Sequence, residues 1–164
     1  MYMAGKITIR ECFNNAYNVN VSGTHVMTHT FMPLLLESSD PRLIFVAGLS
    51  NITVAAQKYF PTPPIPAGWP KKSDWFETIG YRCSKTALNM LMLDWNHKLK
   101  EDRVKVWGVG PGFLTTDLGG MREWAVKAGT RHPSEGGVLL RSVVEGDRDG
   151  EAGLLINKDG LSPY

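Results

Sequence analysis

Two side chains near the middle of the chain have the types and the spacing that acid–base chemistry needs. Tyr81 and Lys85 lie four residues apart at the start of a long predicted helix, which places them on one helical face about 6 Å apart. An ammonium group at that distance favours the phenolate and lowers the pKa of the tyrosine. The pair therefore predicts a phenol that gives or takes a proton near neutral pH.

The helix that carries this pair is predicted over residues 81–101 from its apolar periodicity. Leu88, Met92 and Leu99 lie on one stripe, and Met90 extends the apolar surface well beyond a single face. A helix that is apolar on two sides packs against a sheet and also against a second body, which favours another chain.

Three apolar runs predict the strands that hold this helix in place. They cover residues 43–47, 104–109 and 152–157, and continuous apolar runs are typical of strands buried on both faces of a parallel sheet. Helices are predicted over residues 9–38, with a kink or break at Pro33, and over 135–145, with Ser134 as the N-cap. Strands that alternate with helices favour an α/β fold with a mostly parallel sheet and right-handed connections.

One segment departs from this alternation. Residues 61–70 hold five of the ten prolines, a density that helices and inner strands do not accommodate. We therefore expect an insertion loop over residues 51–80, inside a single domain that covers residues 1–164.

Further residues follow the predicted elements in a recognisable order. Asn20 lies in the first helix, Ser50 follows the strand that ends at Gly48, and a Pro-Gly-x-x-x-Thr stretch from Pro111 to Thr116 follows the next strand. Together with the Tyr-x-x-x-Lys spacing, this order resembles the short-chain dehydrogenase/reductases. The resemblance implies an α/β fold with a partial Rossmann-like, doubly wound parallel sheet of about three strands, in which the N-terminal strands of that family are absent.

The resemblance also implies roles for these residues in an oxidoreductase. Tyr81 would exchange the proton with the substrate oxygen, Lys85 would tune its pKa, and Asn20 would hold a water for proton relay. The family's serine ends the strand, where this chain has Gly48. Two readings stay open: Ser50, two positions further on, is the substrate hydrogen-bond donor, or no residue fills that role.

The cofactor that the resemblance implies is NAD(P), with hydride transfer to or from a carbonyl or alcohol of a small organic metabolite. Pro111, Gly112 and Thr116 match the stretch that lies beside the nicotinamide, together with Tyr81 and Lys85. The sequence has no glycine-rich turn of the kind that holds the cofactor pyrophosphate in dinucleotide-binding folds.

Two other functions are compatible with the same residues. A Tyr–Lys pair in an apolar pocket can also transfer protons without a cofactor, as in an isomerase, dehydratase or cyclase of secondary metabolism. Alternatively, the chain is a non-catalytic partner that dimerises through the helices that carry Asn20 and Tyr81, which the resemblance implies would pair between two chains.

Weaker patterns favour plain structural roles. His25 and His29 have the spacing of two helical metal ligands, but no third ligand has a matching position, so we expect no metal site. The Gly-x-Ser sequence that ends at Ser50 begins like a nucleophile elbow, but Ile52 stands where the second glycine of that motif belongs.

Composition and charge narrow the range of partners. The chain has 164 residues, 43% of them hydrophobic, and a net charge of +2 with both signs spread along the sequence. The scattered charge argues against a nucleic-acid partner, and no apolar run approaches the ~20 residues of a membrane-spanning helix. Two cysteines and no visible signal peptide favour a reduced, cytoplasmic protein. The resemblance implies a small-molecule substrate, and the wide apolar surfaces of the helices that carry Asn20 and Tyr81 favour a homo-oligomer.

Overall fold

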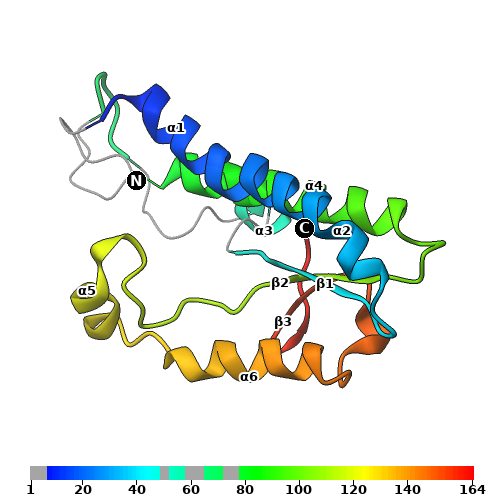
Figure 1. The fold of residues 1–164 in the computed structure, drawn as a ribbon. Helices are drawn as coiled ribbons and strands as arrows, with labels where there is room; N and C mark the ends of the chain where they lie inside the picture. Colours follow the sequence, from blue (N-terminus) through cyan, green and yellow to red (C-terminus); the bar gives the residue numbers. More distant parts are fainter. Residues whose placement is uncertain (1–6, 49–51, 58–64, 72–77) are drawn as a thin grey trace.

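The fold is built on one four-stranded sheet with helices on both faces (Figure 1). The computed structural model describes residues 7–48, 52–57, 65–71 and 78–164. The strands, in spatial order, are β1 (Arg42–Val46), β2 (Lys105–Val109), β3 (Leu155–Asn157) and β4 (Gly160–Leu161). The first three are parallel and β4 pairs antiparallel with β3. This confirms the predicted α/β fold with a mostly parallel sheet, to which the short β4 is an addition.

Helices cover the two faces of the sheet unequally (Figure 1). One face carries α1 (Ile9–Tyr17), α2 (Thr24–Leu36) and α4 (Ile79–Lys98), and the other carries α6 (Pro133–Val144). Val106 of β2 belongs to the core cluster beneath α4, whereas Trp107 and Val109 belong to the cluster beneath α6. Because strand side chains alternate between faces, β2 needs apolar residues throughout, which is why its sequence shows a continuous apolar run.

The long N-terminal helix is interrupted at a different place from the one predicted. A π-helical turn, η1 (Asn18–Gly23), joins α1 to α2, whereas Pro33 lies inside α2, which continues to Leu36. Met32 and Leu35 pack against the core, so tertiary contacts hold the last turns of α2 despite the backbone donor that proline lacks. Of the kink or break predicted at Pro33, the break is therefore wrong, and the irregular turn lies earlier and contains Asn20.

Short elements account for most of the other differences. α3 (Ile52–Gln57) lies inside the predicted loop 51–80, and α5 (Arg122–Lys127) forms where no periodic pattern predicts a helix. The N-cap of α6 is His132 rather than the predicted Ser134, because the His132 side chain accepts a hydrogen bond from the Ser134 N–H. Among the helices of the described residues, none is both long and apolar enough to cross a membrane.

Charged side chains join the amino ends of β1 and β2. Arg42 and Lys105 both donate hydrogen bonds to Asp149, and the Lys105 ammonium lies 2.6 Å from that carboxylate and 2.7 Å from Asp40. The Arg42 guanidinium and, second to it, the Lys105 ammonium hold the pKa of Asp149 at about 2, below its ordinary value of 3.8. The predicted site residues lie at the opposite, carboxyl ends of these strands.

Candidate active site

The predicted acid–base pair lies at the carboxyl end of β1. Tyr81 and Lys85 occupy the first two turns of α4, and the Lys85 ammonium lies 5.7 Å from the centre of the Tyr81 ring. Gly48 faces them from the strand end: a Cβ atom at Gly48 would lie 3.6 Å from the Tyr81 hydroxyl and 3.7 Å from Lys85 Cγ. The end of the first strand and the start of α4 therefore meet at the phenol.

The Lys85 ammonium is engaged by the main chain of the strand. Its Nζ donates a hydrogen bond of 2.9 Å to the carbonyl oxygen of Val46, the last residue of β1. This bond holds the ammonium beside the Tyr81 ring, with its charge directed at a backbone carbonyl.

Burial determines the pKa values of both groups. Burial raises the pKa of the Tyr81 phenol and lowers the pKa of the Lys85 ammonium, because each charged form loses solvation in a half-buried site. The prediction of a lowered tyrosine pKa is therefore wrong for this arrangement, in which the ammonium is directed at Val46. At neutral pH the phenol keeps its proton, so Tyr81 can act as a proton donor.

A buried hydroxyl links Asn20 to the same turn of α4. Asn20 Nδ2 donates to Ser84 Oγ at 2.9 Å, and Ser84 Oγ donates to the main-chain oxygen of Tyr81 at 2.7 Å. Ser84 is fully buried, so water does not compete for these bonds. Ser84 is not among the predicted site residues, although its position three residues after Tyr81 places it close to the same helical face.

The π-helical turn explains how Asn20 reaches α4. Such turns add a residue to the helical repeat and recur at functional sites. Gly23 permits the turn, because a Cβ atom there would lie 2.9 Å from the main-chain oxygen of Asn18. The structure thus places Asn20 against the turn that carries Tyr81.

The loop after β2 lies at the neighbouring strand end. Gly112 has a φ of 86°, which glycine adopts readily, and the Arg131 guanidinium fills the space that a side chain at Gly112 would take. Arg131 Nη2 donates to the main-chain oxygen of Pro111 at 3.3 Å, and the Thr116 hydroxyl accepts the Leu118 N–H at 3.4 Å. No local pattern predicts this role of Arg131, because Pro111 and Gly112 lie about twenty residues earlier in the chain.

The predicted site residues fall into two neighbouring groups. Tyr81 and Lys85 lie at the carboxyl end of β1, with Asn20 bonded to Ser84 on the same turn of α4, and the Pro111–Thr116 stretch follows the parallel strand beside β1. Ser50 lies outside the described residues.

The cofactor expected from the sequence is NAD(P), and the residues at these strand ends could hold its nicotinamide end. Ligands of open α/β sheets bind at the carboxyl ends of the strands, and the donors there include a phenol, an ammonium and a threonine hydroxyl. Gly48 leaves the space beside the Tyr81 hydroxyl free of a side chain from the strand end. Tyr81 and Lys85 would hold the ribose side, and Pro111, Gly112 and Thr116 would lie along the nicotinamide.

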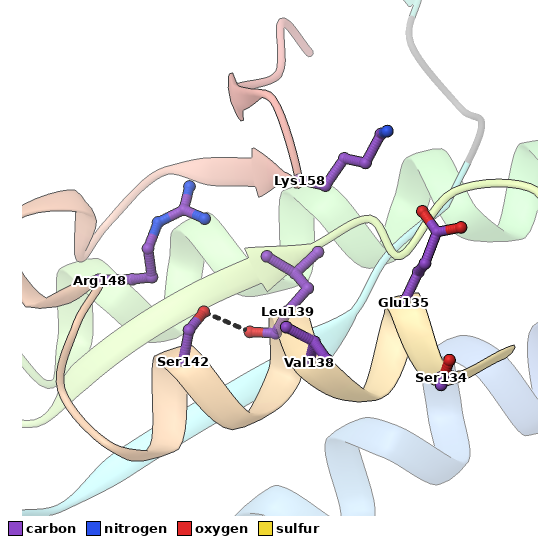
Figure 2. A pocket seen from close by; sticks show the side chains of 7 residues that line it. All are labelled: Ser134, Glu135, Val138, Leu139, Ser142, Arg148 and Lys158. Carbon is purple, nitrogen blue, oxygen red and sulfur yellow. Dashed lines mark hydrogen bonds between the residues drawn. The ribbon is translucent and has the colours of Figure 1, made fainter. Parts of the chain in front are cut away.

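A cavity of about 310 Å³ lies elsewhere, between α6 and the end of the sheet (Figure 2). Figure 2 shows Glu135 and Ser134 of α6 on one side and Arg148 and Lys158 on the other. Arg148 is already paired with Glu151 and donates to the Asn157 carbonyl, so its charge is satisfied within the chain. None of the predicted site residues that the structure describes lines this cavity.

Known proteins resemble this chain over almost its whole length. No protein-family model matches the chain. The short-chain dehydrogenase/reductase tropE of Talaromyces stipitatus is 52% identical over 165 residues, which cover 98% of this chain and 62% of tropE. The short-chain dehydrogenase/reductase eupG of a Phoma species is 43% identical over 172 residues, which cover 98% of this chain and 61% of eupG. The chain thus spans less than two thirds of the length of either relative.

Solved structures share the fold at low sequence identity. The NADPH-bound carbonyl reductase from chicken fatty liver superposes with a TM-score of 0.72 and 18% identity, over 99% of this chain and 58% of the reductase. A short-chain dehydrogenase from Escherichia coli, complexed with NADPH, gives a TM-score of 0.64 and 21% identity, over 94% of this chain and 55% of that protein. These likenesses identify the sheet as part of a Rossmann-like fold.

Proposed function

Because the chain belongs to the short-chain dehydrogenase/reductase family, we propose that it serves hydride transfer between NAD(P)(H) and a carbonyl or alcohol of a small organic metabolite. The observation that carries this proposal is the position of the Tyr81 hydroxyl, between the carboxyl end of β1 and the Lys85 side chain. The adjoining glycine loop lies at the next parallel strand end, where the nicotinamide would bind.

The protonated state of Tyr81 favours reduction of a carbonyl over oxidation of an alcohol. When bound, NAD(P)H supplies the hydride that adds to the carbonyl carbon. Tyr81 gives its proton to the carbonyl oxygen as the C–O bond becomes single, which leaves a phenolate that a nearby ammonium stabilises. Burial raises the pKa of Tyr81, so the proton is present at neutral pH before each turnover. In the oxidation direction the same oxygen accepts the proton of the alcohol.

Asn20 supports this chemistry through a positioning role. Its amide reaches the turn of Tyr81 by way of the buried Ser84 hydroxyl, and these bonds hold η1 at a fixed distance from α4. A water held near Asn20 would return the proton to the phenolate, in keeping with the role expected from the sequence.

NADPH is the cofactor that we expect this chain to bind. The two solved structures described above are both complexes with NADPH. In this chain the residues that fit the cofactor are those at the nicotinamide end, so we expect weak binding, with a dissociation constant near the millimolar range.

The proposal is tested by titrating NADPH and NADH against the purified chain, followed by the fluorescence of the reduced nicotinamide. We expect saturable binding that Lys85→Met weakens and that Lys98→Met leaves unchanged. Lys98 is the matched control, because it lies at the other end of the same helix, where its ammonium pairs with the exposed Asp94 and lies over the Trp95 ring. Absence of saturable binding at millimolar cofactor would contradict the proposal, and cofactor-free turnover lost in Tyr81→Phe would favour a proton-transfer enzyme instead.

We also propose that two copies of the chain associate through the exposed apolar side of α2 and α4. Four apolar side chains on this side are at least half exposed: Val26, Met27 and Phe31 of α2, and Met90 of α4. Exposed apolar side chains on neighbouring helices are typical of an interface between chains.

A further inference from the structure

The Arg131 side chain lies against the loop that follows β2. A Cβ atom at Gly112 would overlap Arg131 Nη2 and would lie 3.2 Å from Arg131 Cζ. Arg131 Nη2 donates to the main-chain oxygen of Pro111 at 3.3 Å, and Arg131 Nη1 donates to Glu135 Oε2 of α6, also at 3.3 Å. Any side chain at residue 112 would displace the guanidinium, so the glycine and the arginine share one space.

The main chain of Arg131 is joined to the same loop. Its N–H donates to the Phe113 oxygen at 3.4 Å, and its carbonyl oxygen accepts the Thr115 N–H at 2.8 Å. Thr115 Oγ1 also donates to the main-chain oxygen of Thr130 at 3.0 Å. These bonds close the base of the stretch 116–129, which carries α5. Arg131 therefore contacts the loop through both its main chain and its side chain.

The loop also packs against the first turn of α6. A Cβ atom at Gly136 would lie 2.6 Å from Leu114 Cδ1 and 3.1 Å from Pro111 Cβ, so the loop cannot move further toward this helix. The contacts at Gly112 are of a different kind, because the three heavy atoms nearest to a Cβ atom there all belong to the Arg131 guanidinium. The backbone conformation at Gly112 therefore depends on a side chain from about twenty residues later.

We propose that Arg131 is a positioning residue, which holds Gly112 in its left-handed conformation and so presets the loop beside which the nicotinamide would bind. Gly112 has a φ of 86°, and glycine adopts positive and negative φ values about equally readily, so the glycine alone does not select this conformation. The guanidinium selects it by filling the adjacent space. A preset loop loses less conformational entropy on binding, which strengthens binding. The effect on cofactor binding, though not that on the loop, rests on the function proposed above.

The first test measures the motion of Gly112 in the chain without cofactor. Gly112 is the only glycine in the sequence that follows a proline, so a sample with ¹³C-carbonyl proline and ¹⁵N-glycine gives one correlated amide signal, that of Gly112. We expect its order parameter to be near the ~0.85 of a rigid backbone in the parent chain and below about 0.6 in Arg131→Ala. Arg131→Lys, which keeps the charge without the planar fork, should lower it too.

Chemical rescue shows whether the guanidinium itself is responsible. Ethylguanidinium has the atoms that Arg131→Ala removes, so we expect it to restore the order parameter, whereas ethylammonium should not. Arg141→Ala is the control, because Arg141 lies on α6 and pairs there with the exposed Glu145. Far-ultraviolet circular dichroism confirms that each variant folds. An order parameter unchanged in both Arg131 variants overturns the proposal, as does a fall that ethylguanidinium does not reverse or that ethylammonium reverses equally.

The effect on cofactor binding is measured separately, by titrating NADPH against the same samples and following the amide resonances of the chain. We expect the dissociation constant to rise about tenfold in Arg131→Ala, to recover with ethylguanidinium and to stay unchanged in Arg141→Ala. A mobile Gly112 in Arg131→Ala with unchanged affinity for NADPH overturns the effect on binding. If the parent chain binds no NADPH while Gly112 responds as expected, the proposed function alone is contradicted.

Discussion

Gly48 has no side chain, so the space beside the Tyr81 hydroxyl has room for one small group. A Cβ atom there meets the hydroxyl and the Lys85 stem at ordinary contact distances, so a small side chain is accommodated. Gly48→Ser would place a second hydroxyl at the substrate oxygen. Preorganised donors of this kind stabilise the charge that develops there, so we expect carbonyl reduction to rise on the order of tenfold.

The matched control for this change is Gly48→Ala, which fills the same space without a donor. Both variants are compared by the rate of NADPH oxidation with aromatic aldehydes. An equal effect of alanine and serine would show that the hydroxyl has no role, and the position of Gly48 would then be a matter of packing.

At the scale of single residues, spacing alone predicts the Tyr81–Lys85 pair, because four residues on a helix fix the geometry. The direction of the Lys85 ammonium could not be predicted, since its acceptor, the Val46 carbonyl, lies 39 residues away in sequence. The same long-range dependence explains the raised pKa of Tyr81, which comes from burial rather than from its neighbour on the helix.

Among the elements, η1 and α4 are joined by the buried Ser84 hydroxyl. Ser84→Ala removes the acceptor of Asn20 Nδ2, and we expect a loss of about 1–3 kcal/mol in the free energy of unfolding, the cost of leaving a partly buried donor unpaired. Urea unfolding measures it. The control is Thr86→Ala on the same helix, whose hydroxyl bonds only its own helix at Arg82; a similar loss in both variants would contradict a link between the helices.

The amino ends of β1 and β2 depend on the Asp149 carboxylate. Its pKa of about 2 lies below the value of 3.8 for an unpaired group, so its contribution to stability is complete above pH 3.8 and is lost as pH falls toward 2. Asp149→Asn should therefore lower the melting temperature at pH 6, and the difference from the parent chain should shrink between pH 4 and 2. A difference that does not change with pH would show that the carboxylate charge is not involved.

Periodicity predicts the strands and α4 because their apolar patterns are set by burial in the core. It fails at η1 and α3. The π-turn depends on the fit between Gly23 and the Asn18 oxygen, and α3 is held by Thr53, which bonds the main-chain oxygen of Tyr164 more than one hundred residues later. Such contacts have no trace in a local window of sequence.

For the molecule as a whole, the apolar side of α2 predicts self-association. Phe31 is 50% exposed in the single chain, and Phe31→Glu places a charge in the middle of the proposed interface. We expect the dimer dissociation constant to rise about tenfold or more, measured by sedimentation equilibrium. Val138→Glu on α6, an exposed apolar residue on the other face, is the control; a chain that is monomeric before either change would contradict the interface.

The resemblance to short-chain dehydrogenase/reductases predicts the partial parallel sheet. The sequence itself has no glycine-rich turn of the kind that holds the cofactor pyrophosphate. The relatives that are 52% and 43% identical to the chain are short-chain dehydrogenase/reductases, and the chain spans less than two thirds of the length of each. What the sequence does not predict is the hydrogen bond from Lys85 to the Val46 carbonyl, which forms only when the strand end and the helix start lie together in space.

The most direct test of the account follows the hydride itself. The chain is incubated for hours with millimolar NADPH that carries deuterium at the transferable position and with aromatic aldehydes, and the alcohols formed are analysed by mass spectrometry. We predict alcohol with one deuterium on the former carbonyl carbon, formed by the chain and reduced at least a hundredfold in Tyr81→Phe. Alcohol without deuterium, or equal amounts of deuterated alcohol from the chain and from Tyr81→Phe, would contradict hydride transfer assisted by Tyr81.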